Sequence, residues 1–211
     1  MKRTPSSPPR RKPRQSRAHQ TSLALQGAFI RLLVERGIGG ITIREIVALA
    51  GASLGSFYEY FESKDHLARV CVHIRTKELL HQLQTASGRQ VGRPLRETVN
   101  ALVEAHTAPH RERPEEWGAH YLLERQFSGI EPYRKMYESF VDGWGAAISA
   151  ASDPVPASLV PEAARVSLTV LYGLTAHAHV RGIGAPDLQA LSFQARTAIN
   201  AYLEAISPPH A

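Results

Sequence analysis

Residues 39–67 read GGITIREIVALAGASLGSFYEYFESKDHL, and this stretch predicts short helices in quick succession. Thr42 stands before an apolar helical run, and Glu45 follows three residues later. That pattern is a capping box, in which each side chain accepts a hydrogen bond from the backbone amide of the other residue. Gly51 is expected to end the helix in a tight turn, because glycine adopts a positive φ at little cost. Ser53 is then placed to cap a second short helix.

Two short helices joined by a tight turn form a helix-turn-helix. We expect them over residues 42–50 and 53–61, with a longer helix before them from about residue 19 to residue 36. In such a motif the first short helix braces the second, which enters the major groove of DNA with its N-terminus leading. Phe57 and Phe61 are four residues apart, so they share one helix face and are expected to pack inward against the longer helix.

The other face of the second short helix carries the candidate DNA-reading residues. Ser53, Gly55 and Ser56 are small, so they allow close approach to the groove. Tyr58 and Tyr60 carry hydroxyl groups that can reach phosphates or base edges. The sequence therefore predicts that this helix reads DNA, although it contains no Lys or Arg.

Most of the positive charge lies in an N-terminal arm. Residues 1–20 carry seven Lys and Arg side chains and no acidic ones, which leaves a net charge of −1 for residues 21–211. Because this segment is rich in Pro and Ser, we expect a disordered basic arm over residues 1–17. Such an arm commonly grips nucleic acid, and its Arg14 and Arg17 are candidate DNA contacts. A solubilising tail or a membrane-surface patch is the alternative interpretation.

Further phosphate contacts are expected around the reading helix. Thr42 and Ser53 mark helix N-termini, whose free amides and dipole favour a phosphate. Arg44 projects from the bracing helix, and Lys64 begins the next helix beside the groove. These contacts position the protein on DNA, whereas the reading helix supplies what base readout there is.

The stretch resembles the N-terminal domain of the TetR/AcrR family of transcriptional regulators. The resemblance rests on Thr42 opening the helix, on I-x-x-x-A-G-x-S at residues 46–53, on G-x-x-Y-x-Y-F at 55–61 and on S-K-D-x-L at 63–67. It covers roughly residues 18–78, and its motifs agree in order and distance. It places these residues at DNA-contacting positions: Thr42, Arg44, Ser53, Leu54, Ser56, Tyr58, Tyr60 and Lys64.

One position departs from the family pattern. Many members have Lys or Arg where this chain has Leu54, which could instead meet a thymine methyl or a sugar. The resemblance further implies a homodimer on a roughly palindromic double-stranded operator, a helical C-terminal ligand domain, and repression relieved by a small molecule.

The rest of the chain also reads as helical. We therefore expect an all-α protein of about nine helices, with a three-helix helix-turn-helix DNA-binding domain over residues 18–65. A helical ligand-binding and dimerisation domain is expected over residues 66–211. Two segments in it, residues 161–181 and 187–206, have broad apolar faces, so both are expected to pair with the same segments of a second chain.

Aromatic residues at helical spacing are the candidate lining of a ligand pocket. For any single residue an ordinary core is the more common explanation, but the polar groups of Trp and Tyr favour a pocket for the set as a whole. The carboxylate of Glu124 is compatible with a cationic ligand, whereas the positive charges of Arg125 and Arg134 are equally compatible with an acidic one. The candidate ligand-binding residues are Trp117, His120, Tyr121, Glu124, Tyr133, Tyr137, Phe140 and Trp144.

Other classes of protein find little support in the sequence. It contains no nucleophile elbow, phosphate loop, dinucleotide fingerprint or cluster of metal ligands, so we expect neither an enzyme nor a metal or cofactor. His106 and His110 have a chelating spacing, but Pro109 is expected to interrupt their helix. No apolar run is long enough for a membrane span, and we expect a cytoplasmic, nucleoid-associated protein. The alternative is a helical protein-interaction or non-specific DNA-binding module without a ligand response.

Deletion of residues 1–14 tests the role of the arm. The slope of log affinity against log salt concentration should become shallower, by about 0.9 for each phosphate contact that is lost. Fluorescence anisotropy of labelled DNA at several salt concentrations measures that slope. An unchanged slope would show that the arm does not contact phosphates.

Overall fold

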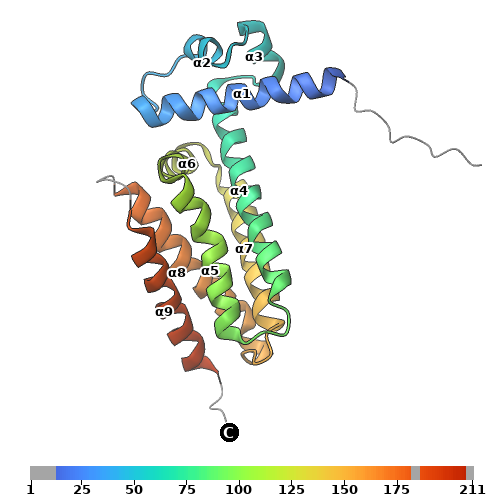
Figure 1. The fold of residues 1–211 in the computed structure, drawn as a ribbon, viewed down its shortest axis with the longest axis vertical. Helices are drawn as coiled ribbons and strands as arrows, with labels where there is room; N and C mark the ends of the chain where they lie inside the picture. Colours follow the sequence, from blue (N-terminus) through green and yellow to red (C-terminus); the bar gives the residue numbers. More distant parts are fainter. Residues whose placement is uncertain (1–12, 182–185, 208–211) are drawn as a thin grey trace, which may run out of the picture. The chain divides into compact units, whose positions relative to one another are not determined.

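The computed structural model describes residues 13–181 and 186–207, and within these ranges all regular secondary structure is helical (Figure 1). The chain divides into two compact units, of which the first ends at Leu67 and the second begins at Ala68. The first unit contains α1 (Pro13–Arg36), α2 (Ile43–Ala50), α3 (Leu54–Tyr60) and the first turn of α4 (Lys64–Arg89). The second contains the rest of α4, α5 (Leu95–Glu112), α6 (Pro114–Phe127), α7 (Ile130–Ser149), a 3₁₀ turn η1 (Ala157–Leu159), α8 (Val160–Val180) and α9 (Leu188–Ile206).

The local signals for α2 and α3 are confirmed. Thr42 Oγ1 accepts from the amide of Glu45 at 3.3 Å, and Glu45 Oε2 accepts from the amide of Thr42 at 2.9 Å, which completes the capping box. Gly51 ends α2 in the left-handed region at φ 64°. Ser53 caps α3 by accepting from the amide of Ser56 at 3.0 Å.

The first unit is held together by aromatic side chains from α1 and α3. Phe57 is completely buried, and its ring lies 5.6 Å from that of Phe61. Leu25 and Phe29 of α1 are also completely buried, and α1 packs against both α2 and α3. The helix-turn-helix is therefore fixed by burial, because a helix of seven residues has too few hydrogen bonds to be stable alone.

The start of α1 is a correction to the sequence-based expectation. We expected the helix to begin at about residue 19, but it begins at Pro13, so residues 13–17 are helical. The apolar periodicity on which the expectation rested begins only later in the helix. Proline fits the first turn of a helix, because the first amides have no helical acceptor in any case. Residues 1–12 of the expected arm lie outside the described residues.

The second unit is a layered bundle of long helices. α8 packs against α6, α7 and α9, and α9 also packs against α5. Trp144 of α7 is completely buried at the centre of this core. α4 and α7 approach closely at Gly143, where an added Cβ would lie 3.0 Å from Leu83 Cδ2.

A second correction concerns Pro109, which does not end α5. The helix continues through this proline to Glu112. Because proline has no backbone N–H, one helical hydrogen bond is missing, but only a few residues before the helix ends. Pro109, His106 and His110 are all buried, and this packing compensates for the lost bond. As a result His106 and His110 lie on one face of α5, with their rings stacked at 5.0 Å.

Candidate nucleic-acid interface and ligand cavity

The packing of Phe57 determines which residues of α3 are presented to solvent. Phe57 is completely buried, whereas Tyr58 is 55% exposed and Leu54, in the first turn of the helix, is 44% exposed. Ser53 and Gly55 are exposed as well, at the N-terminal end of the helix. The exposed end is narrow and uncharged, which suits entry into the major groove.

Next to this end of α3 lies a shallow polar hollow. It is formed where the start of α1 passes the α2–α3 turn. Ser53 and Ser56 share a hydrogen bond there, with their hydroxyl oxygens 2.9 Å apart. The residues that line the hollow are Gln20, Thr21, Ala24, Ala50, Gly51, Ala52, Ser53 and Ser56.

The cations expected around α3 differ in their exposure and in their hydrogen-bond partners. Arg17 and Arg44 are exposed and form none of the ion pairs found in the described part of the chain. Lys64 is half-buried, and its Nζ donates to the carbonyl oxygen of Ile41 at 2.8 Å. Lys64 therefore ties the α1–α2 loop to the start of α4 and keeps two N–H donors for other partners.

Two of the expected positions are less open than the sequence indicated. The backbone amide of Thr42 already donates a hydrogen bond to the carboxylate of Glu45, so it is not free for a phosphate. Arg36 Nη1 also donates to that carboxylate, at 2.8 Å. Tyr60 is half-buried, in contrast to Tyr58. The backbone of Arg14 belongs to α1, but its side chain lies outside the described part of the structure.

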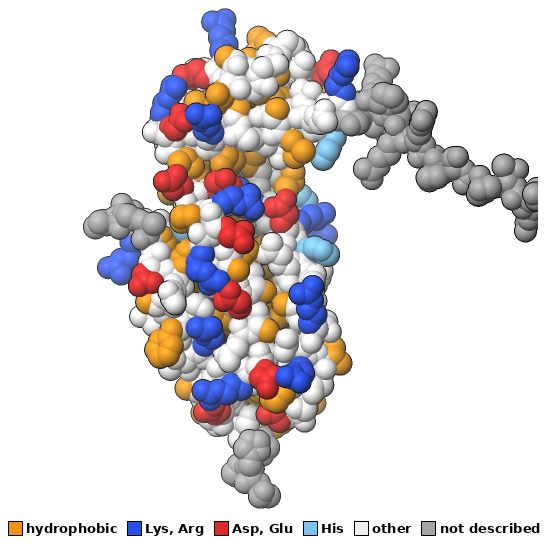
Figure 2. Space-filling view, in the orientation of Figure 1, with side chains coloured by type: hydrophobic (Ala, Val, Ile, Leu, Met, Phe, Trp, Pro, Cys, Tyr) orange, Lys and Arg blue, Asp and Glu red, His pale blue; other side chains and the backbone are white. Residues whose placement is uncertain are grey.

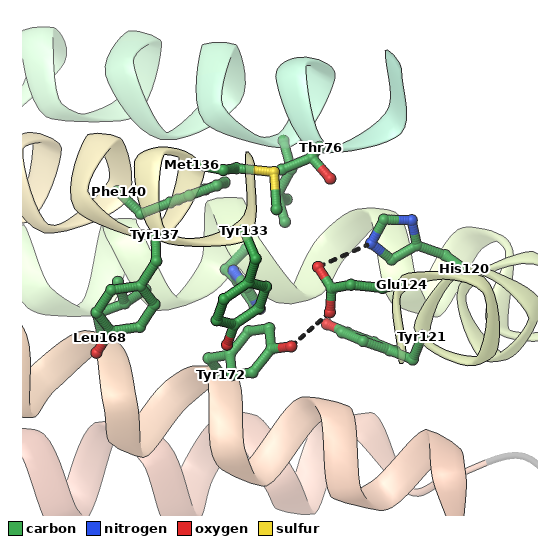
Figure 3. Close-up of a pocket in the computed structure, with 12 residues that line it drawn as sticks. Thr76, His120, Tyr121, Glu124, Tyr133, Met136, Tyr137, Phe140, Leu168 and Tyr172 are labelled. Atoms are coloured by element: carbon green, nitrogen blue, oxygen red, sulfur yellow. Dashed lines mark hydrogen bonds and ion pairs between the residues drawn. The ribbon is translucent and has the colours of Figure 1, made fainter. Parts of the chain in front are cut away.

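The second unit encloses a narrow cavity of about 30 Å³ (Figure 3). α4, α5, α6, α7 and α8 all contribute to its walls. The lining residues are Thr76, Leu79, His106, His120, Tyr121, Glu124, Tyr133, Met136, Tyr137, Phe140, Leu168 and Tyr172.

Glu124 is the acidic group of this cavity. Its carboxylate is 5% exposed and accepts a short hydrogen bond from the hydroxyl of Tyr172. His120 Nε2 lies 3.9 Å from the other carboxylate oxygen, as the dashed lines in Figure 3 indicate. Burial raises the pKa of Glu124, against the opposing effects of the Tyr172 hydrogen bond and of Arg125.

Histidine rings form a second buried cluster beside the cavity. The His110 ring stacks on Trp117 at 3.9 Å, and its Nε2 lies 3.0 Å from the hydroxyl oxygen of Tyr121. His179 lies against the same rings, 5.4 Å from His110. His106 Nε2 and Trp117 Nε1 are buried without a hydrogen-bond partner. Among the residues that the structure describes, no three potential ligands are placed to hold a metal ion.

The structure brings six of the eight candidate ligand residues to the cavity: His120, Tyr121, Glu124, Tyr133, Tyr137 and Phe140. Trp117 and Trp144 lie outside its lining and belong to the packed core. Sequence reasoning missed Tyr172, because it lies in the apolar run of α8, and His106, because Pro109 was expected to break α5. A polar side chain inside an apolar helix is the signal that could have pointed to Tyr172.

A wider groove adjoins the cavity along α4 and the α6–α7 connection. The cavity and the groove share Thr76, Tyr133 and Met136, so these residues separate the narrow interior from a wider entrance. The other groove residues are Arg69, Val72, His73, Lys77, Leu80, Phe127, Ser128, Gly129, Pro132, Lys135 and Ser139.

The second unit shows no strongly charged area on the face drawn in Figure 2. Lys and Arg side chains alternate there with Asp and Glu along the helices. No helix in the described residues is long and apolar enough to span a membrane.

Comparisons with known proteins relate the first unit to one family. Residues 28–71 match the family model described as bacterial regulatory proteins, tetR family. Curated protein sequences gave no match.

Solved structures share the fold of most of the chain. A transcriptional regulator from Rhodococcus sp. Rha1 is 18% identical, with a TM-score of 0.70 over 90% of this chain and 99% of that chain. A TetR-family transcriptional regulator from Streptomyces coelicolor is 18% identical, with a TM-score of 0.70 over 90% of this chain and 97% of that chain. A SmeT–triclosan complex is 18% identical, with a TM-score of 0.67 over 86% of this chain and 90% of that chain. These likenesses show a common fold with an N-terminal helix-turn-helix domain and a C-terminal helical domain.

The histidine cluster predicts that acid destabilises the protein. Burial lowers the pKa of His106 to about 4 and that of His120 to about 3, and it also lowers the pKa values of His110 and His179. In the unfolded chain these histidines bind protons near their ordinary pKa of about 6.5. Between about pH 6.5 and 4 the unfolded state therefore binds more protons, and stability falls as the pH falls. Each histidine lowers the free energy of unfolding by up to about 1.4 kcal/mol for each pH unit of acidification in this range. The raised pKa of Glu124 has the opposite effect on stability, but it is one group against several histidines.

Urea unfolding followed by Trp fluorescence measures this effect, because both tryptophans lie in the second unit. The midpoint should be lower at about pH 5 than at about pH 7.5. His106→Gln should reduce the difference, whereas His73→Gln, at an exposed position on α4, should leave it unchanged. An equal or higher midpoint at the lower pH would contradict the prediction.

Proposed function

We propose that this chain, whose residues 28–71 match the model of the tetR family of bacterial regulatory proteins, is a sequence-specific DNA-binding repressor that a small molecule releases. The observation that carries the proposal is α3, which buries Phe57 and presents Tyr58 and Leu54 beside a capped, narrow N-terminus. The role is one of binding rather than catalysis, and it places the protein on the nucleoid in the cytoplasm.

Recognition of DNA divides into positioning and reading. Arg44 and the arm contact phosphates. Lys64 adds a further phosphate contact through the two N–H groups that do not donate to the carbonyl oxygen of Ile41. Ser56 and Tyr58 reach base edges or phosphates from α3, and Leu54 meets a thymine methyl or a sugar. Each subunit places one α3 in one major groove, so the operator is roughly palindromic, with half-sites about one helical turn or a little more apart.

Release by a ligand requires a mechanical link between the two units. α4 supplies that link, because it begins in the first unit with Lys64 and lines the cavity in the second with Thr76 and Leu79. A ligand that favours one position of α4 would change the distance between the two α3 helices of a dimer. The SmeT–triclosan complex supports this role, since that protein of the same fold holds a small molecule.

Dimer formation is proposed through the outer faces of α8 and α9. Phe193 of α9 is 65% exposed, and Ala190, Thr197 and Ala201 are exposed on the same side of the helix. On α8, nothing lies within 4 Å of the position that a Cβ of Gly173 would take, so a partner helix can approach closely. A face of small and apolar residues with few charges suits a symmetric helix–helix interface.

Substitution Phe193→Glu tests this interface. A buried charge without a partner opposes association, so the variant should sediment as a monomer at micromolar concentration, where the unchanged protein is a dimer. Ile130→Glu is the matched control, because Ile130 is 67% exposed on α7 and should tolerate the charge without loss of the dimer. The interface is wrong if the unchanged protein is monomeric, or if Phe193→Glu remains dimeric.

Selection of genomic fragments by the purified protein at two salt concentrations tests DNA recognition. A repressor should enrich a single palindrome at both concentrations, because base readout adds to the salt-sensitive phosphate term. Tyr58→Phe should then weaken operator binding roughly tenfold through one lost hydrogen bond to a charged group. Tyr202→Phe, at a half-buried position on α9, should not. Uniform enrichment that disappears at higher salt would instead indicate the alternative of non-specific binding.

A further inference from the structure

The charge balance of the cavity indicates which kind of ligand it takes. Glu124 is buried, and none of the described residues that line the cavity is Lys or Arg. A buried carboxylate without a positive partner is costly, so it either takes up a proton or awaits a cation. The remaining question is whether any nearby cation of the protein itself serves this carboxylate.

The nearest histidine does not serve as that cation. His120 Nε2 is 3.9 Å from the Glu124 carboxylate, but burial together with the charge of Arg75 keeps the pKa of His120 at about 3. The ring is therefore neutral at physiological pH. The two groups form a polar contact rather than an ion pair.

No arginine in the described part of the chain forms a hydrogen bond or an ion pair with Glu124. Arg125 is exposed and acts on the carboxylate only through its charge, and Arg134 donates to Glu131 at 2.6 Å on the surface. Arg75 lies over the Trp117 ring at 5.3 Å and donates to Glu116 at 2.6 Å. The sequence left cationic and acidic ligands equally open, but in the fold no arginine lines the cavity.

Aromatic rings surround the same carboxylate. The Tyr172 ring meets those of Tyr121 and Tyr133 edge to face, with centroids 6.0 and 6.4 Å away, and Tyr137 stacks on Tyr133 at 6.4 Å. Figure 3 shows the rings of Tyr121, Tyr133 and Tyr172 near Glu124, and that of Tyr137 farther along the cavity, towards Phe140 and Leu168. The faces of aromatic rings attract cations, most strongly where water is excluded.

A second polar atom lies in the same walls. His106 Nε2 is buried without a hydrogen-bond partner, although His106 lines the cavity. A buried unpaired nitrogen of this kind is stabilised when a bound molecule supplies the missing partner. His106 therefore leaves one polar atom beside the cavity without a partner.

We propose that the cavity binds a small organic monocation with an apolar body, whose positive nitrogen lies against Glu124 and among the rings of Tyr121, Tyr133 and Tyr172. The inference rests on the proposed ligand role of this cavity and adds the charge of the ligand. Leu79, Met136, Phe140 and Leu168 hold the apolar body. The cavity alone is small, about 30 Å³, and it shares Thr76, Tyr133 and Met136 with the adjoining groove, which has about 580 Å³ for the rest of the ligand.

Calorimetric titration of the DNA-free protein with two probes tests the proposal. The probes are benzyltrimethylammonium and its neutral carbon isostere 2,2-dimethylpropylbenzene, which share shape and differ in charge. The unchanged protein should bind the cation at least about tenfold more tightly than the isostere. Preference for the isostere, or no binding of the cation up to about 10 mM, would overturn the proposal.

Glu124→Gln removes the charge and keeps an acceptor for the Tyr172 hydroxyl, so the cavity should retain its shape. The variant should bind the cation at least about tenfold more weakly, with less than about a threefold change for the isostere. Glu131→Gln, at an exposed position on α7, is the matched control and should change neither affinity. Unchanged binding of the cation by Glu124→Gln would also overturn the proposal.

The titrations contain no DNA, so they separate this inference from the proposed function. A protein that binds the cation but selects no operator contradicts the repressor alone. A protein that selects an operator but prefers the isostere contradicts the cationic ligand alone.

Discussion

The burial of Phe57 is the constraint on which the DNA-binding unit depends. α3 is only seven residues long, so it is held in place by the packing of Phe57 and Phe61 against α1 rather than by its own hydrogen bonds. The caps at Thr42 and Ser53 fix where the helices begin, and this packing fixes which way α3 faces. The exposed position of Tyr58 is the direct consequence.

The second unit differs from the first because its interior contains buried polar side chains. Glu124, His106 and His110 are removed from water, and hydrogen bonds from Tyr172 and Tyr121 satisfy only some of their atoms. A core built for stability alone would place apolar side chains there. Unsatisfied polar atoms on the wall of a cavity are better understood as a binding site that its ligand completes.

The parts that sequence reasoning predicted correctly depend on local signals. The capping box, the turn glycine and the serine cap each involve residues a few positions apart, so the sequence displays them directly. The cavity is assembled from five helices, and no local pattern places Tyr172 of α8 opposite Glu124 of α6. The rule that proline ends a helix failed at Pro109, because burial of the surrounding residues stabilises the last turn of α5. The hydrogen bond from Lys64 to Ile41 was not predictable from local sequence either, because the two residues are 23 positions apart.

The central claim is that one chain couples a cavity for an organic cation to a DNA-reading helix, and reciprocity tests it most directly. The measurement is the affinity for benzyltrimethylammonium with and without the selected operator, together with the affinity for operator with and without the cation. The account predicts that operator weakens cation binding by the same factor by which the cation weakens operator binding, on the order of 5- to 150-fold. Equal cation affinities for the free and the operator-bound protein would contradict it.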